Sequence, residues 1–454
     1  MEDIPLNKII FILTLCFLWV HAAKADQIVN QTLKDLMKRD RKQEPSRTKI
    51  EKPAPVVTVN PVTVSMAPLA KERTFKVLSP ETKACIQCHN KLTPGIVSDW
   101  LQSQHAKENV GCFECHESPD KNAPGAFEHN GFLIHVVVSP KDCSACHPQE
   151  TKQFEESRHA VARQFIAGVP GLEVTSENTL FATMGNTITI RGCQACHGTV
   201  VKIGKDGQPT SDTWPNQGIG RINPDGSFGS CTTCHTQHRF SLEEARKPEA
   251  CANCHIGPDH PQYEIYMESK HGNIYATRGT HWDWNAQPGK WDILKTGAAP
   301  VCVTCHMDAG LPGMKTTHNL SANLSWALQA PLSYHYPDWH AKQENMQEVC
   351  YHCHSTVWTQ NYFKQADATL NVYENRFYKP VFDMKRKLIA EGRWPSTPFS
   401  TPIQFKFFEY WHHEGRCARF GAFMQGPDYE LWHGFYKLEL NKIELMKQMK
   451  KMEW

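Results

Sequence analysis

The chain has 454 residues, of which 49 are basic and 47 are acidic, so its formal net charge is only +2. This balance excludes the strongly charged surfaces typical of proteins that bind nucleic acid or anionic membranes, and we expect neither as a partner. The length is sufficient for one large domain or two ordinary ones, each with a buried core.

The N-terminal residues 1–25 have the pattern of a secretory signal peptide: a short polar start, an apolar run from Ile9 to Val20, and a small-residue site that ends at Ala25. The apolar run is shorter than the roughly 20 residues of a membrane-spanning helix. We therefore predict cleavage after Ala25, with an uncleaved anchor as the alternative. No later apolar run has spanning length, so we expect a mature chain without a membrane span, exported to the bacterial periplasm or an equivalent compartment.

Residues 26–80 are rich in proline and valine, as in EKPAPVVTVNPVTV, and they show no helical period. This composition is typical of an extended arm or linker rather than of a packed domain.

Between residues 81 and 356 the motif CxxCH occurs eight times and uses sixteen of the 18 cysteines. Two thiols three residues apart add to the two vinyl groups of one haem, and the adjacent histidine binds the iron. A single copy could belong to a zinc or thioredoxin-like site, but eight copies after an export signal predict eight covalent c-type haems. The attachment cysteines are Cys85, Cys88, Cys112, Cys115, Cys143, Cys146, Cys193, Cys196, Cys231, Cys234, Cys251, Cys254, Cys302, Cys305, Cys350 and Cys353, and the proximal iron ligands are His89, His116, His147, His197, His235, His255, His306 and His354.

With so little polypeptide for each haem, we expect the haems of this octahaem-binding domain, residues 81–356, to form much of the core. Alternation of period two is not sustained anywhere, and helical periodicity appears mainly after the last motif, as in residues 371–392. The predicted fold class is mainly α: short helices and loops wrapped around haems, then a helical C-terminal region over residues 357–454.

A haem that only transfers electrons usually takes a second histidine, which closes its iron to substrate. Several spare histidines lie in similar settings, such as SQHA, SRHA, SKHG and DWHA. Catalysis in addition requires one open iron. The candidate distal ligands are His105, His135, His159, His238, His271, His318 and His340.

An Asp-His pair, Asp259 and His260, follows the sixth motif in GPDHPQY. A carboxylate can orient an imidazole, and an imidazole can exchange protons near neutral pH, so the pair suits the distal side of a catalytic haem. The alternative is a surface turn in which His260 simply ligates a haem.

The eight motifs resemble those of the octahaem hydroxylamine oxidoreductase family, which includes hydrazine dehydrogenases. GPDHPQYEIYMESKHG, RINPDGSFGSCTTCHTQHRFS and YWHHEGRCARFGAFMQGPDYELWHGFY carry the resemblance, which runs from about residue 81 to about residue 440. It implies a mostly helical homotrimer with seven bis-histidine haems. The haem on Cys193, Cys196 and His197 would be the five-coordinate catalytic one, with Asp259 and His260 over its iron.

The resemblance also implies two tyrosines at the site. One is a distal tyrosine, for which Tyr334 is preferred and Tyr336 is the alternative. In oxidising members of the family the other comes from a neighbouring subunit and is bonded covalently to the catalytic haem; by its place in GPDYELWHGFY this would be Tyr429. Tyr436 and Tyr410 are the alternatives for that role.

The favoured function is therefore oxidation of hydroxylamine or hydrazine, with electrons passed to a small cytochrome c. The alternatives are reduction of nitrite or hydroxylamine on the same scaffold, and a non-enzymatic electron conduit. Two observations limit what the family implies. Cys417 stands in GRCARFG where a basic residue is expected, and every motif ends in histidine, which disfavours the nitrite reductases that use CxxCK.

Overall fold

The computed structural model describes residues 77–164, 180 and 183–452. The predicted signal peptide and nearly all of the predicted arm lie outside these residues. The described residues belong to one compact unit, so the division predicted near residue 356 remains a prediction. Within the described ranges, no helix is both long enough and apolar enough to cross a membrane.

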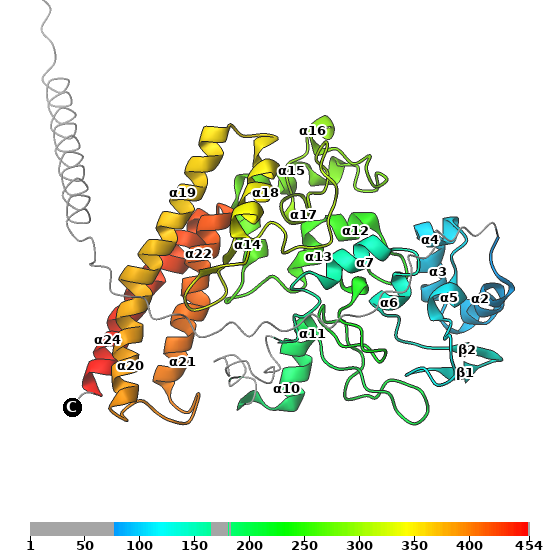
Figure 1. Cartoon of the computed structure of the whole chain (residues 1–454), viewed down its shortest axis with the longest axis horizontal. Coiled ribbons are helices and arrows are strands. Elements are labelled where there is room, and N and C mark those ends of the chain that lie inside the picture. The colour runs from blue at the N-terminus through cyan, green and yellow to red at the C-terminus, as the bar shows by residue number, and fades with distance from the viewer. Residues whose placement is uncertain (1–76, 165–179, 181–182, 453–454) are drawn as a thin grey trace, which may run out of the picture. The chain divides into compact units, whose positions relative to one another are not determined.

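Short helices joined by loops make up the part of the chain that contains the CxxCH motifs (Figure 1). Two of them, α2 and α6, begin with a proline in the first turn after a serine cap, at Ser79–Pro80 and Ser139–Pro140, and both features favour helix initiation. The α-helices are α2 Pro80–Leu92, α3 Pro94–Gln102, α4 Gln104–Lys107, α5 Cys112–His116, α6 Pro140–Cys143, α7 Pro148–Glu155, α10 Asn186–Arg191, α11 Cys193–His197, α12 Leu242–Arg246, α13 Pro248–Ala252, α14 Gln262–Glu268, α15 Lys270–Arg278, α16 Ile293–Thr296, α17 Cys302–Met307 and α18 Trp339–Tyr351, with 3₁₀ turns at Cys231–Thr233 and Gly279–His281.

In the described residues, the strands are short and form two antiparallel pairs. β1 (Phe127–His129) pairs with β2 (Phe132–Ile134), and β3 (Trp326–Ala327) pairs with β4 (Tyr334–His335). Asn130 and Gly131 join β1 to β2 with φ angles of 50° and 85°, a tight turn that asparagine and glycine tolerate because both readily adopt positive φ. The predicted mainly α fold class is therefore confirmed.

Three long helical stretches follow the last motif and lie side by side in Figure 1. Each contains a π-helical segment, where one extra residue per turn shifts the side chains that face a neighbour. The first is α19 Thr356–Val372, π segment Tyr373–Tyr378 and α20 Lys379–Ala390; the second is α21 Pro402–Glu409, π segment Tyr410–Glu414 and α22 Gly415–Met424; the third is α23 Pro427–Glu430, π segment Leu431–Phe435 and α24 Tyr436–Lys451.

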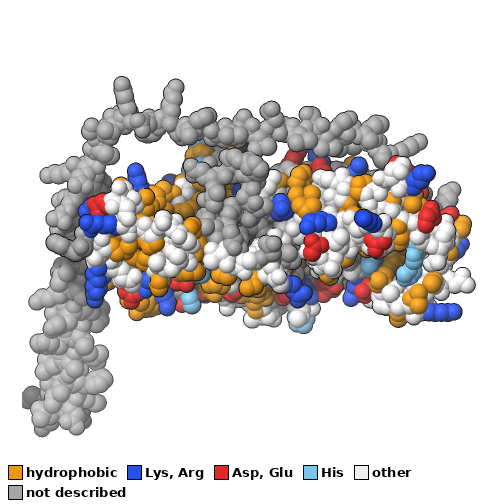
Figure 2. Space-filling model, turned by 90° about the horizontal axis from the view of Figure 1, so that it is seen from below, with side chains coloured by type: hydrophobic (Ala, Val, Ile, Leu, Met, Phe, Trp, Pro, Cys, Tyr) orange, Lys and Arg blue, Asp and Glu red, His pale blue; other side chains and the backbone are white. Residues whose placement is uncertain are grey.

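The C-terminal bundle has a core of its own. Tyr373, Leu388, Tyr410, Leu438 and Leu445 are fully buried in one apolar cluster that contains no residue of a CxxCH motif. A second cluster, rich in tryptophan, packs around the seventh motif. On the face shown in Figure 2, side chains of both charges are interspersed with apolar ones, as the near-neutral net charge leads one to expect.

Candidate functional site

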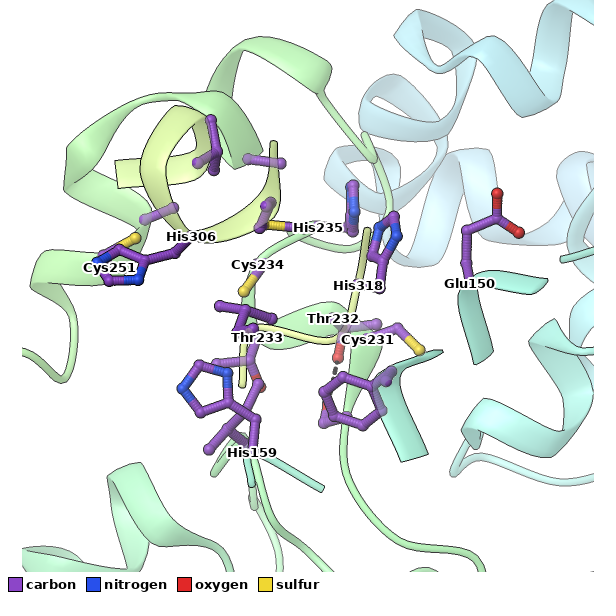
Figure 3. A pocket seen from close by; sticks show the side chains of 18 of the residues that line it. Glu150, His159, Cys231, Thr232, Thr233, Cys234, His235, Cys251, His306 and His318 are labelled. Atoms are coloured by element: carbon purple, nitrogen blue, oxygen red, sulfur yellow. Dashed lines mark hydrogen bonds between the residues drawn. The ribbon is translucent and has the colours of Figure 1, made fainter. Parts of the chain in front are cut away.

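A single cavity of about 2460 Å³ runs through the motif region and is lined by side chains from all eight CxxCH motifs. None of the motif cysteines is in a disulfide, and all of them except Cys88, Cys193 and Cys353 line this cavity. Figure 3 shows the thiols of Cys231, Cys234 and Cys251 and the imidazoles of His235 and His318 around one part of it. Adjacent free thiols and imidazoles around an apolar interior fit covalently attached haems.

Several motifs fold as one short helical turn, for example α5, α11 and α17. In a helix, residues three and four apart lie on the same face. The two cysteines and the histidine of a CxxCH are therefore presented together, which is the arrangement that attachment and iron ligation require.

Three of the predicted distal ligands occur in the pattern Ser-x-His, and the serine explains how they are positioned. Ser103 and Ser269 are buried N-caps that accept hydrogen bonds from the Ala106 and Gly272 amides. The histidine two residues later therefore lies in the first turn of its helix, and both His105 and His271 line the cavity. In the third copy, Ser157 accepts a hydrogen bond from the backbone of His159 itself.

Six proximal histidines face a second histidine across the cavity. An iron about 2 Å from a nitrogen of each ring would hold the two ring centres roughly 6 Å apart, and the observed separations agree. The ring-centre distances are 6.1 Å for His89–His129, 6.4 Å for His116–His238, 6.2 Å for His147–His105, 6.4 Å for His235–His318, 5.9 Å for His255–His159 and 6.1 Å for His354–His271.

His129 was not among the predicted ligands, yet it faces His89. It ends β1 just before the Asn130–Gly131 turn. The Asn-Gly pair between two apolar-aromatic segments is a strong hairpin signal, and it could have shown that His129 is held in a rigid turn beside the first motif.

His135, a predicted ligand, contacts His116 from the other side. Its carbonyl oxygen lies 2.8 Å from Nδ1 of His116, and its own Nε2 lies 3.3 Å from Oδ2 of Asp142. The carbonyl occupies one nitrogen of His116 and leaves the other for iron, so this geometry favours His238 as the opposing ligand and assigns His135 to orienting His116.

His340 differs from the other candidates. Asp338, which takes the place of the capping serine, has a φ angle of 57° and makes no side-chain cap. The His340 ring stacks on Trp339 with their centres 3.5 Å apart, and it does not line the cavity. The role of His340 as a distal ligand therefore stays a prediction.

Neighbouring motifs also lie close together through their cysteines. The sulfur atoms of Cys143 and Cys231, of Cys196 and Cys254, and of Cys251 and Cys302 interact with each other. The sixth motif, with Cys251 and Cys254, therefore touches both the fourth and the seventh.

Asp259 and His260 lie beside the fourth motif. Nδ1 of His260 is 2.7 Å from Oδ1 of Asp259, and both side chains line the cavity and interact electrostatically with Cys196. Burial opposes ionisation of Asp259, but the hydrogen bond and charge of His260, with the charges of His412 and Arg416, hold the pKa of this carboxyl well below its usual range. His260 also approaches His255 of the sixth motif, with ring centres 6.1 Å apart, so the alternative in which it ligates that haem stays open.

The cavity wall next to Asp259 comes from the C-terminal bundle and was not assigned from the sequence. His412 and His413, from the π segment Tyr410–Glu414, line the cavity together with Arg416 of α22. Nη1 of Arg416 lies 3.8 Å from Oδ2 of Asp259. These residues lie in the sequence YWHHEGR. Two consecutive histidines followed by an arginine could have indicated a polar site.

Cys417 is buried on the same helix, with Sγ 3.6 Å from the carbonyl oxygen of Pro258. It does not line the cavity, and burial raises the pKa of its thiol to about 12. Cys417, which occupies the position where a basic residue was expected, therefore packs against the loop that carries Asp259.

The predicted tyrosines fall in different places. Tyr334 is 50% exposed and lies outside the cavity lining, whereas Tyr336 is buried and lines it, so the alternative is better placed for the distal role. Tyr429 is partly buried, stacks on His433 at 4.7 Å, and does not line its own chain's cavity. Tyr410 is fully buried and cannot reach a neighbouring subunit, while Tyr436 is 53% exposed.

Comparison with known proteins agrees with this architecture. The family described as seven times multi-haem cytochrome CxxCH matches residues 226–393, and cytochrome c7 and related cytochrome c matches residues 180–256. A solved structure titled hypothetical multiheme protein superposes with a TM-score of 0.74 at 26% identity, covering 83% of this chain and 96% of that one. The chain is a multihaem cytochrome c related to hydroxylamine oxidoreductase-like proteins.

Other relatives of this multihaem cytochrome are larger or more distant. A probable nitrite reductase-hydroxylamine oxidoreductase fusion protein of Kuenenia stuttgartiensis is 28% identical over 57% of this chain and 29% of its own length. The C-type polyheme cytochrome OmcB of Geobacter sulfurreducens is 23% identical over 54% of this chain and 38% of its own. The chain thus spans well under half of these curated relatives. A reducing HAO-like protein complex of Kuenenia stuttgartiensis shares the fold, with a TM-score of 0.62 at 21% identity over 82% of this chain and 85% of that one.

Proposed function

We propose that this cytochrome is an oxidoreductase that converts a small nitrogen compound at the haem of the fourth CxxCH motif, while the haems of the other seven motifs carry electrons. The observation that supports this best is the Asp259–His260 pair beside Cys196. When bound, the haem of Cys193, Cys196 and His197 would supply an open iron position and a one-electron redox couple.

The residues of the chain would handle protons and orientation. Asp259, kept ionised by its neighbours, fixes the ring of His260 through Nδ1. Nε2 of His260 is then the nitrogen that can accept or donate a proton at the substrate. Tyr336 rather than Tyr334 is the tyrosine that we assign to the cavity side of the site.

Electron transfer would follow the contacts between motifs. Because the sixth motif touches the fourth and the seventh, we place it at the junction between the catalytic haem and the rest. Cys88, Cys146 and Cys353 are exposed, so we place the haems of the first, third and eighth motifs nearest the surface. A small cytochrome c would exchange electrons there, in the periplasm or an equivalent compartment to which the chain is exported.

Two directions are possible for this chemistry. Oxidation of hydroxylamine or hydrazine, favoured by the sequence, would use a covalent bond between Tyr429 and the catalytic haem of a neighbouring subunit. The exposed Tyr436 is also positioned for a contact between subunits. Reduction of nitrite or hydroxylamine is favoured by the cation at Arg416, which faces the site beside Asp259.

We also propose the homotrimer that the family resemblance implies. An exposed apolar stripe on the third helical stretch supports it, because such stripes are usually covered. Trp432, Tyr436, Leu440 and Ile443, spaced four, four and three residues apart, are 56%, 53%, 45% and 60% exposed.

One set of measurements on the purified haem-loaded protein tests this function. Reduced protein should bind carbon monoxide at one high-spin haem, and the steady-state rates with hydroxylamine, hydrazine and nitrite should separate the two directions. Peptide mapping should find Tyr429 bonded to haem if the protein oxidises hydroxylamine or hydrazine. Wholly low-spin protein that binds no carbon monoxide would instead make it an electron conduit.

A further inference from the structure

Arg221 is a buried arginine in the segment RINPDGSFGS, which leads into the fifth motif. It is only 3% exposed, and it lines the cavity. Its backbone oxygen accepts a hydrogen bond of 2.6 Å from the Gly229 amide, two residues before Cys231. Its Nη2 donates a hydrogen bond of 2.6 Å to the carbonyl oxygen of Val138, just before the helix that ends at Cys143. Arg221 is therefore joined to the segments that lead into the third and the fifth motifs.

The groups that bind the guanidinium of Arg221 are neutral. Nε donates a hydrogen bond to Oδ1 of Asn223 at 2.7 Å, and Nη1 and Nη2 each donate one to a backbone carbonyl. Within the described ranges, no carboxylate forms an ion pair with this guanidinium. The exposed Asp225 acts on its charge from beyond ion-pair distance. Burial lowers the pKa of Arg221, but an arginine stays protonated nonetheless, so the side chain places a fixed positive charge in the interior.

This charge lies where two haem attachment sites meet. The sulfur atoms of Cys143 and Cys231 interact with each other and with Arg221. Each sulfur becomes a neutral thioether once haem is attached, so neither can compensate the charge in the loaded protein. The two cysteines belong to the third and the fifth motifs. The haems that they hold would therefore approach one another here, with Arg221 beside both.

We propose that Arg221 raises the reduction potentials of the haems attached through Cys143 and Cys231, so that electrons collect at this pair. The inference rests on the part of the proposed function that assigns haems to the third and fifth motifs. A haem iron that passes from the ferric to the ferrous state takes up one electron from an adjacent reduced haem and loses one positive charge. A nearby cation destabilises the ferric form more than the ferrous form, and burial leaves its field less screened than in water.

The position of this pair gives such a store of electrons a use. The third motif contains the exposed Cys146. The backbone of Arg221 packs against Gly198, directly after the fourth motif: a Cβ on Gly198 would lie 2.3 Å from the Arg221 amide nitrogen. The pair thus connects an attachment site at the surface with the proposed site of reaction. A conversion that transfers several electrons benefits from haems that hold them between encounters with a one-electron partner.

The test measures haem potentials in the haem-loaded protein. His318→Ala removes the ring that faces His235 and should give the fifth-motif haem an additional high-spin signal, so that redox titration of this signal measures the potential of that haem alone. Adding Arg221→Gln should lower the ratio of reduced to oxidised haem at a given potential roughly tenfold, which is a fall of about 59 mV in the reduction potential. Adding Arg221→Lys, which keeps the charge, should recover most of this shift. Arg376→Gln is the control, because it removes an exposed arginine that pairs with Glu439, and it should leave the potential unchanged.

The outcomes separate the two proposals. Peptide mapping that finds no haem on the third or fifth motif of the wild type contradicts the proposed function itself. Full haem loading with an unchanged potential in Arg221→Gln overturns the role of Arg221 alone, and so does an equal shift in Arg221→Lys, because the charge would then not be the cause. If Arg221→Gln does not fold, Asn223→Asp decides, since it keeps an acceptor for Nε and sets a negative charge against the guanidinium. It should lower the potential, and an unchanged potential would overturn the proposal.

Discussion

Nδ1 of His260 lies 2.7 Å from Oδ1 of Asp259, in a cavity wall shared by the fourth and sixth haem motifs. The contact fixes the orientation of the ring and leaves Nε2 as the nitrogen that can exchange a proton with a bound substrate.

Asp259→Asn tests this arrangement. An amide can still fill the space, but it cannot stabilise a protonated imidazole, so we expect turnover of nitrite and of hydroxylamine to fall by about a hundredfold or more. Steady-state kinetics measures the effect, and the haem absorption spectrum should stay unchanged. Asp212→Asn is the matched control, since Asp212 is exposed and pairs with Lys202. Equal activity of both variants would remove Asp259 from the chemistry.

Substitutions of His238 and of His135 should have opposite effects, although both rings lie 6.4 Å from the ring of His116. His238→Ala should open the haem of the second motif, so that the reduced protein binds one additional equivalent of carbon monoxide and gains a high-spin signal. His135→Ala should leave the iron six-coordinate because it removes only the partner of Asp142. Additional carbon monoxide binding by His135→Ala and not by His238→Ala would reverse the assignment.

Glu414 should make the stability of the protein depend on pH. Burial, with a smaller contribution from Glu409, raises its pKa to about 7, while Asn441 donates a hydrogen bond to it. The folded state therefore binds a proton more tightly than the unfolded chain, so stability from this group is full at acid pH and is lost as pH rises toward 7. Glu414→Gln should remove that dependence and stabilise the protein at pH 8 by about 1 to 3 kcal/mol.

Denaturant unfolding of both proteins at pH 5 and pH 8 measures this effect. The two proteins should differ little at pH 5, where Glu414 is protonated. A difference that is the same at both pH values would mean that Glu414 does not titrate in this range.

Trp432→Glu tests the apolar stripe on α23–α24. If a second copy covers this face, a buried carboxylate should dissociate the assembly, and light scattering should show the mass falling to that of a monomer. Leu294→Glu is the control, because Leu294 is 43% exposed on the short helix α16, away from the stripe. A wild-type protein that is already monomeric would contradict the proposed trimer.

The spacing of the motifs was sufficient to predict the class of cofactor, because CxxCH encodes its chemistry within five consecutive residues. The mainly α fold was predicted from helical periodicity and the absence of sustained alternation of period two. The distal ligands were only partly predictable. Ser-x-His fixes the local turn of His105, His159 and His271, but which haem each one faces depends on contacts between segments far apart in the chain. His129 and Arg416 were missed for the same reason. Their roles depend on residues far away in the chain that they contact in the fold, His89 and Asp259.

The separate core of the C-terminal bundle has a consequence for the biogenesis of the protein. Leu388, Leu438 and Leu445 pack against one another in this core and do not line the cavity. The motif region, in contrast, surrounds a cavity that attached haem must fill. We therefore expect this core, within residues 357–452, to form before haem attachment is complete, so that an immature chain presents a folded C-terminal bundle while the motif region awaits its cofactors.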